Sequence, residues 1–249
     1  MNTIVDLWQF AEAASHEQDA KNLSPLIYSM KFVSTKTEET YSFIVEYSDS
    51  IYISFMGTKK SVKSWLMNFW AYPLKTDEQI EFYRNCLVHT ETGEPGIIHN
   101  GYYKVWLQSK KMVDDYDFCD KQIYVTGKSQ GGALAMICAR HLTKNRKLKV
   151  NLVTFASPAA GNEKFCEEMN EFVPFNYRVV YGYDIVPLMP PEEAGFRHCG
   201  AYLHLRAPLW HKYFHRIRDH YYSSYTKGLI EKFVGDVFVL KNILSRVVD

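Results

Sequence analysis

Short apolar runs alternate with amphipathic stretches through the middle of the chain. Three runs rich in β-branched and aromatic residues predict buried strands, at Gln122 to Thr126, Val150 to Phe155 and Tyr177 to Tyr183. Stretches with helical spacing lie around 102–116, 131–143 and 162–171. Because strands that alternate with helices form parallel sheets covered on their faces, we expect an α/β fold with a mostly parallel central sheet and helices on both faces.

The remaining patterns extend this fold toward both ends of the chain. Apolar residues at helical spacing predict an amphipathic helix that ends near Ser15 or His16. Two apolar strands, Tyr41 to Tyr47 and Ile51 to Phe55, flank a Ser-Asp-Ser turn and predict a β-hairpin. The periodic stretch Leu229 to Val248 predicts a helix packed on the sheet. No repeat or flexible linker divides the sequence, so we expect residues 1–249 to form a single domain.

Composition and charge exclude several classes of protein. The chain has 29 Lys and Arg against 28 Asp and Glu, a formal net charge of +1, which gives no general attraction for nucleic acid. No apolar run approaches the roughly 18 residues of a membrane span, and the N-terminus lacks the basic region of a signal peptide. The five cysteines are odd in number and widely spaced, which excludes C-x-x-C motifs and a fully paired disulfide framework. We expect a cytoplasmic protein without nucleic-acid partners or stable membrane insertion.

The strongest chemical signal is a G-x-S-x-G motif at Gly127-Lys128-Ser129-Gln130-Gly131. It lies between a predicted strand and a predicted helix, where a sharp turn exposes a strained serine. The flanking glycines remove the Cβ atoms that would clash with the adjacent strand and helix. The helix N-terminus favours negative charge that develops on a substrate. Ser129 is therefore a candidate nucleophile, although so short a pattern also occurs by chance.

A serine nucleophile needs a base, and the base needs an acid that orients it. Asp184 follows the strand Tyr177 to Tyr183 and so lies at the carboxyl edge of the sheet, where ligands bind in open α/β folds. Its alternative role is that of a turn or helix-capping aspartate. Five of the nine histidines lie between His198 and His220, so the residues alone leave the base open.

The chain resembles the class 3 (fungal-type) lipase family of the α/β-hydrolase superfamily. The resemblance rests on short segments that follow one another in the family's order across about residues 40–225: Ile53 to Thr58, His99 to Tyr103, Gly127 to Ala135, Thr154 to Pro158 with Gly161-Asn162, and Asp184 to Pro187. The order of these segments is more specific than any one of them.

The resemblance implies a catalytic triad. It makes Ser129 the nucleophile and Asp184 the acid. The family's base is a histidine closely followed by aromatic residues, a pattern that His220 matches best. His204 and His215 remain the main alternatives for the base.

The resemblance also implies an oxyanion hole and a lid. Its two donors would be the backbone N–H groups of Gln130 and Thr58. The helix expected at about 60–72 carries an apolar stripe, and it is either the family's lid or a fixed helix packed on the sheet. Lys128 departs from the family, which most often has histidine there. This cation either biases head-group choice or simply faces solvent.

The function implied is a serine hydrolase that cleaves carboxylic esters, in particular lipid acyl esters, with transient contact to a lipid interface. The alternative is a catalytically silent, lipase-like binding or regulatory module. We expect no cofactor. A zinc site at His211 and His215 is disfavoured, because the segment between them lacks the glutamate of H-E-x-x-H.

Overall fold

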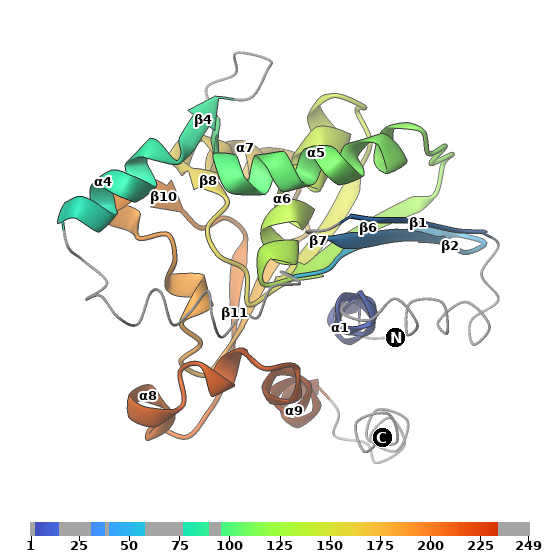
Figure 1. The fold of residues 1–249 in the computed structure, drawn as a ribbon. Coiled ribbons are helices and arrows are strands. Elements are labelled where there is room, and N and C mark those ends of the chain that lie inside the picture. Colours follow the sequence, from blue (N-terminus) through green and yellow to red (C-terminus); the bar gives the residue numbers. More distant parts are fainter. Residues whose placement is uncertain (1–2, 15–30, 38–39, 58–76, 90–95, 234–249) are drawn as a thin grey trace.

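The computed structural model describes the chain except for residues 1–2, 15–30, 38–39, 58–76, 90–95 and 234–249. Among the described residues, seven strands form a central sheet (Figure 1). In spatial order they are β1 (Lys31–Lys36), β2 (Tyr41–Glu46), β3 (Ser50–Phe55), β6 (Gln122–Lys128), β7 (Val150–Phe155), β9 (Asn176–Tyr181) and β11 (Ala201–Leu205). The pairs from β3 to β11 are all parallel, whereas β1, β2 and β3 pair antiparallel.

Helices cover both faces of this sheet, as the sequence predicts. On one face, α6 (Gln130–Lys144) packs against β6 and β7 and is itself covered by α5 (Asn100–Asp114). On the other face lie α1 (Thr3–Ala13) and α9 (Tyr222–Phe233), which contact each other. Figure 1 shows α5 and α6 above the strands and α1 and α9 below them. The middle strands are buried on both faces, which explains their nearly continuous apolar sequences.

Most of the predicted elements are confirmed, and several boundaries differ, among them the end of β6, which extends two residues past Thr126 to Lys128. The N-terminal helix, the hairpin of β2 and β3 and the three helices α5, α6 and α7 (Glu163–Phe172) are present. Strand β9 ends at Tyr181, two residues before its predicted end. The C-terminal helix begins at Tyr222 rather than Leu229, and its predicted continuation beyond residue 233 lies outside the described residues.

Several short elements are absent from the prediction. A second sheet has the order β10 (Phe196–Arg197), β8 (Gly161–Asn162), β5 (Ile97–His99) and β4 (Leu87–His89). Beside it lies α4 (Asp77–Asn85) (Figure 1). A one-turn helix, α8 (His211–Phe214), and a 3-10 turn, η3 (Arg218–His220), connect β11 to α9.

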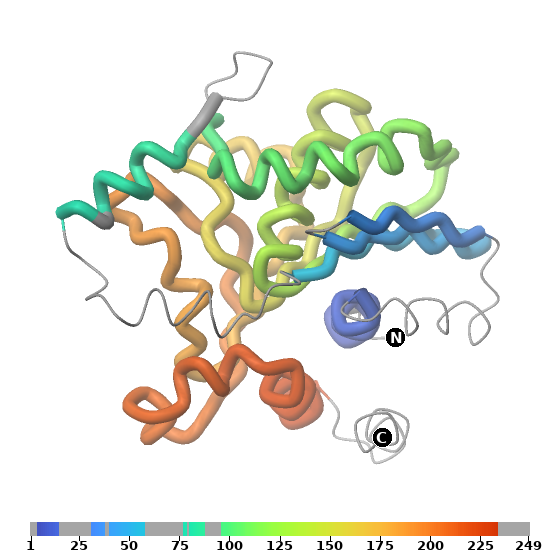
Figure 2. The backbone as a smooth tube through the Cα atoms, viewed as in Figure 1, coloured from blue at the N-terminus to red at the C-terminus, as the bar shows by residue number. Residues whose placement is uncertain are grey.

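The parallel strands bring distant parts of the sequence to one edge. Figure 2 follows the backbone from the green end of β6 to the orange and red segments after β9 and β11. The carboxyl end of β6 leads into Ser129, that of β9 leads toward Asp184, and the connection after β11 contains His220. Parallel strands end at the same edge of a sheet, so the fold gathers these three residues there.

Candidate active site

Ser129 occupies a strained turn between β6 and α6. Its backbone has φ 58° and ψ −130°, a conformation that L-residues adopt at a cost of about 1–3 kcal/mol. The glycines around it are required for close approach. A Cβ on Gly127 would lie 2.2 Å from the carbonyl oxygen of Gly131, and one on Gly131 would lie 2.1 Å from the carbonyl oxygen of Phe55. The predicted strand–turn–helix context of the motif is therefore present.

A continuous set of hydrogen-bond contacts joins the three candidate residues. Nε2 of His220 lies 3.1 Å from Oγ of Ser129. On the other side of the ring, Nδ1 lies 2.9 Å from Oδ2 and 3.1 Å from Oδ1 of Asp184. His220 and Asp184 are buried, and Ser129 is 7% exposed. This is the arrangement of nucleophile, base and orienting acid that activates a serine hydroxyl.

Asp184 is held by two further donors. The backbone N–H of Val186 donates to Oδ1 at 3.0 Å, and the buried hydroxyl of Tyr225 donates to Oδ2 at 2.7 Å. The alternative role as a turn aspartate therefore describes part of its bonding, since the same carboxylate closes the local turn and contacts His220. Together these donors fix the carboxylate beside His220.

The other histidines weighed for the base have contacts elsewhere. His204 donates from Nε2 to the carbonyl oxygen of Gly182 at 2.8 Å, and His198 donates to the carbonyl oxygen of Pro187. His215 packs its ring on Trp210. Among the described histidines, the structure brings His220 alone into hydrogen-bond contact with Ser129.

The environment of His220 favours its neutral form. Burial lowers the pKa of its imidazolium, and the charge of Lys128 lowers it further, against the opposing attraction of Asp184. A neutral imidazole can accept a proton, whereas an imidazolium cannot. The pKa of His220 therefore lies below its usual value.

Of the two predicted oxyanion donors, Gln130 lies within the described residues and Thr58 does not. Gln130 begins α6, so its N–H lies at the positive end of the helix dipole. Thr58 and the predicted helix at 60–72 lie outside the described residues. The residue before Thr58 is close to the nucleophile: a Cβ on Gly57 would lie 3.1 Å from the carbonyl oxygen of Lys128 and 3.4 Å from Cβ of Ser129. The end of β3 therefore passes directly against the elbow.

Comparison with protein families decides where this chain belongs. The family model for lipase (class 3) matches residues 52–194, which is more than half of the sequence. The chain belongs to the class 3 lipase family. This confirms the resemblance found in the sequence motifs, and the matched segment includes the elbow serine and Asp184.

Relatives and solved structures agree with this membership. Lipase ZK262.3 of Caenorhabditis elegans is 31% identical over 153 residues, covering 60% of this chain and 40% of that protein. Secreted mono- and diacylglycerol lipase 1 of Fusarium solani is 30% identical over 144 residues, covering 55% and 39%. The triacylglyceride lipase of Rhizomucor miehei has a TM-score of 0.65 at 19% identity, covering 89% of this chain and 93% of that one. This last similarity shows the shared α/β-hydrolase fold. The chain thus spans about 40% of the length of these two curated relatives.

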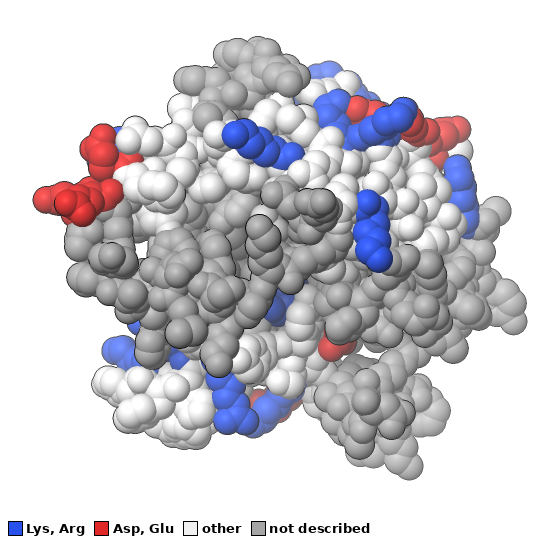
Figure 3. Space-filling model, in the orientation of Figure 1, with Lys and Arg blue, Asp and Glu red and all other residues white. Residues whose placement is uncertain are grey.

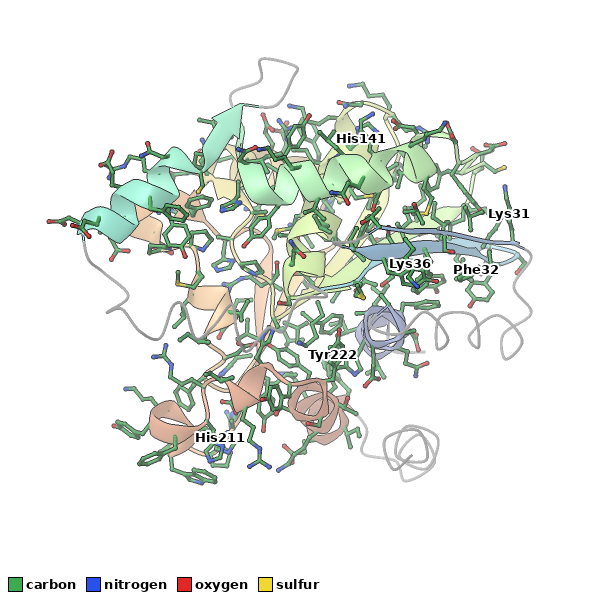
Figure 4. All side chains as sticks on the ribbon, in the orientation of Figure 1. Lys31, Phe32, Lys36, His141, His211 and Tyr222 are labelled. Atoms are coloured by element: carbon green, nitrogen blue, oxygen red, sulfur yellow. The ribbon has the colours of Figure 1, made fainter. Side chains whose placement is uncertain are left out.

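The residue that departs from the family pattern is buried. Lys128 is 3% exposed, so the alternative in which it simply faces solvent is wrong. Its Nζ lies 4.3 Å from the ring centre of Tyr222 and 5.8 Å from that of Tyr225, both on α9. Figure 4 shows Tyr222 between α9 and α1. Burial lowers the pKa of Lys128 to about 8, against the attraction of Asp184 and Glu12.

Helix α9 supports this site in a way that the sequence patterns do not predict. Tyr222 and Tyr225 contact Lys128, and Tyr225 also binds Asp184. The pair stands within an aromatic-rich stretch that includes the base, which is the signal that could have drawn attention to it. Nothing in the local pattern indicates that these rings reach β6.

Two wider features bear on cofactors and membranes. In the described part of the chain, no group of three or more His, Cys, Asp or Glu side chains is arranged to hold a metal ion. His211 instead pairs through Nδ1 with Oδ1 of Asp219 at 2.6 Å. Within the same residues, every helix is too short or too polar to cross a bilayer.

Proposed function

We propose that this protein is a serine hydrolase that cleaves carboxylic esters of lipids through an acyl-enzyme intermediate. The single observation that carries the proposal is the unbroken contact from Asp184 through His220 to Ser129, with the serine at a strained elbow. Membership of the class 3 lipase family supports the same chemistry.

In the first half of the reaction, Ser129 attacks the ester carbonyl. Its Oγ forms a bond to the carbonyl carbon while Nε2 of His220 accepts the hydroxyl proton. Asp184 holds the imidazole in orientation and stabilises its charged form. The tetrahedral intermediate then collapses, the bond to the alcohol breaks, and His220 protonates the departing alcohol oxygen. The acyl group remains on Ser129.

In the second half, water replaces the alcohol. His220 accepts a proton from water as the water oxygen attacks the acyl carbon, and it returns that proton to Ser129 when the acid leaves. We assign the oxyanion donors to the backbone N–H groups of Gln130 and Thr58. One such donor contributes about 10²–10³ in kcat.

The substrate class follows from family and relatives. The Fusarium solani relative is named as a mono- and diacylglycerol lipase, and we propose acyl esters of this kind as substrates. We place the reaction in one domain over residues 1–249. The helix expected at about 60–72 stays a prediction, either as a lid or as a fixed helix packed on the sheet. The five cysteines are free, which supports the predicted cytoplasmic location, whereas some relatives are named as secreted.

The test is turnover of p-nitrophenyl acyl esters by the full chain. Ser129→Ala removes the nucleophile and leaves the fold intact, so turnover should fall to the level of uncatalysed hydrolysis while the circular dichroism spectrum is unchanged. Ser109→Ala is a matched control, because Ser109 is also buried but lies on α5, away from the elbow. Equal turnover in Ser129→Ala and the parent chain would remove Ser129 from the mechanism.

A fluorophosphonate probe distinguishes the hydrolase from a silent module. We expect covalent labelling of Ser129 in the parent chain and none in Ser129→Ala. A folded parent chain that does not react would favour the binding or regulatory module, since the probe requires an activated serine.

A further inference from the structure

An exposed apolar surface lies on the segment that connects β11 to the base. Its members are consecutive or nearly consecutive residues on and before α8: Leu209 (80% exposed), Trp210 (53%), Tyr213 (72%) and Phe214 (80%). We call these four residues the α8 patch. Single exposed apolar residues are normal, but four large ones within six positions mark an interaction surface.

The segment that carries the α8 patch is basic. Residues 201–218 contain four basic side chains, Arg206, Lys212, Arg216 and Arg218, and no Asp or Glu. Arg206, Lys212 and Arg218 are exposed. Figure 3 shows this end of the molecule, at the position of α8 in Figure 1, as a white surface with blue atoms at its margins and a smaller group of red atoms on the side of α9. Since the whole chain has a net charge of only +1, this segment is a local concentration of positive charge.

Contacts to buried groups hold α8 in place and leave the α8 patch exposed. His211 on α8 pairs with the fully buried carboxylate of Asp219 at 2.6 Å, and the backbone N–H of Tyr183 donates to the other oxygen of Asp219 at 2.9 Å. The rings of Trp210 and His215 also pack together. The exposed side chains therefore project from a fixed element.

The α8 patch is adjacent to the candidate triad in the chain and in space. Asp219, the partner of His211, immediately precedes His220. The carbonyl oxygen of Arg216 accepts a hydrogen bond from the backbone N–H of Ile185, which follows Asp184. Two further apolar side chains close to the triad in the sequence are exposed as well: Leu188, four residues after Asp184, and Tyr221, directly after His220. A surface that binds here lies beside the active site.

We propose that the α8 patch docks this protein onto an anionic phospholipid bilayer, with its apolar side chains inserted and its basic side chains against the lipid phosphates. Aromatic and aliphatic side chains bordered by Lys and Arg are the features that bind a bilayer surface. The charge complementarity selects an anionic lipid surface over a second copy of this nearly neutral chain. The role of this docking, to bring the enzyme to its lipid substrate, rests on the proposed ester hydrolysis. The binding itself does not, because it can be measured without turnover.

The test is co-sedimentation of the full chain with vesicles. One set contains phosphatidylcholine alone, and the other contains equal parts of phosphatidylcholine and phosphatidylserine. We expect binding to the mixed vesicles to be stronger and to weaken as salt is added. Ser129→Ala should bind vesicles like the parent chain, because the nucleophile is not part of the α8 patch. If the parent chain itself showed no turnover, the proposed function would be overturned while the vesicle-binding result would still stand.

Two variants separate the apolar and the charged contributions. Leu209→Ser combined with Phe214→Ser should lower binding to both vesicle types by at least about ten-fold, because buried apolar area is lost. Arg206→Gln combined with Lys212→Gln should lower binding to mixed vesicles by about 30-fold, at about five-fold per charge, and leave binding to phosphatidylcholine unchanged.

Matched controls lie at the other end of the molecule. Phe172 is an exposed phenylalanine on α7, and Lys104 is an exposed lysine on α5, both far from α8 in Figure 1. Phe172→Ser and Lys104→Gln should bind like the parent chain. The proposal is overturned if the parent chain does not bind mixed vesicles, if the α8 variants bind as well as the controls do, or if sedimentation without vesicles shows self-association that the Leu209 and Phe214 substitutions abolish.

Discussion

Replacing Lys128 with methionine should stabilise the fold, although this residue stands next to the nucleophile. Methionine has a similar length and fills the same space without a charge, so the packing under Tyr222 is kept. The change removes a buried ammonium whose pKa is lowered from 10.5 to about 8 by burial. The difference is about 2.5 pH units, and at about 1.36 kcal/mol per unit it corresponds to about 3 kcal/mol of destabilisation by the charged form.

The cation–π contact offsets part of this cost. An ammonium over a desolvated aromatic ring gains about 2 kcal/mol at most, and Nζ of Lys128 lies 4.3 Å from the ring centre of Tyr222. The net gain expected for Lys128→Met near neutral pH is therefore about 1–3 kcal/mol in the free energy of unfolding.

The stability gained in Lys128→Met should depend on pH and should decrease as the pH rises. Because the pKa of Lys128 is lower in the folded chain than in the unfolded chain, the unfolded chain binds more protons between about pH 8 and pH 10.5. The stability contribution of Lys128 in the parent protein therefore rises with pH across this window. The advantage of the methionine variant is largest below about pH 8 and declines above it.

Urea denaturation at a series of pH values measures this effect. Lys104→Met is the control, because Lys104 is an exposed lysine on α5 and its loss should leave stability nearly unchanged at every pH. A Lys128→Met variant that is less stable than the parent chain at neutral pH, or whose advantage does not vary with pH, would refute the reasoning.

The same substitution has a second readout in activity. The charge of Lys128 lowers the pKa of His220, so its removal should raise that pKa. His220 must be neutral to accept the proton, and the rise of kcat/KM with pH should therefore move to higher pH in Lys128→Met. An unmoved profile would show that Lys128 does not act on the base.

Three further substitutions test the surroundings of the site. Tyr225→Phe removes a buried hydroxyl that donates to Asp184 and should lower the free energy of unfolding by about 1.5–3 kcal/mol; urea denaturation measures the loss, and an unchanged midpoint would contradict the bond. Glu168→Gln removes the negative charge that faces both Arg140, at 2.7 Å, and Lys144, at 3.1 Å, and should lower the free energy of unfolding by about 3–5 kcal/mol; urea denaturation measures this loss, and an unchanged midpoint would contradict it. Gly127→Ala would place a Cβ 2.2 Å from a carbonyl oxygen of α6 and should cost at least about 3 kcal/mol, visible as a lower melting temperature; wild-type stability would show that the elbow can relax.

Local patterns were sufficient wherever one segment determined its own structure. The hairpin of β2 and β3 was predictable because strand-forming residues flank a turn, and the elbow at Ser129 because glycines at fixed spacing leave few alternatives. The second sheet was not predictable, since strands of two or three residues carry no periodicity.

The predicted ends of elements were wrong where a contact with a distant part of the chain determines the end. β9 ends early because Gly182 takes a positive φ of 53°, and the backbone N–H of Tyr183 then donates to the side chain of Asp219 instead of to a strand. The choice among the histidines has the same origin. The residues left it open and family resemblance favoured His220, while the contact with Ser129 spans 91 positions of sequence.

Lys128 shows most clearly what sequence patterns omit. A lysine beside an elbow is expected to reach water, because isolated ammonium groups are costly to bury. Here two tyrosines of α9 cover it, and one of them also donates to Asp184. A single helix therefore controls the environment of the cation and of the carboxylate, the two charges that act on His220 in opposite directions. A substitution in α9 that shifts either tyrosine should change the pKa of the base without touching it, which connects the stability of this helix directly to the reactivity of Ser129.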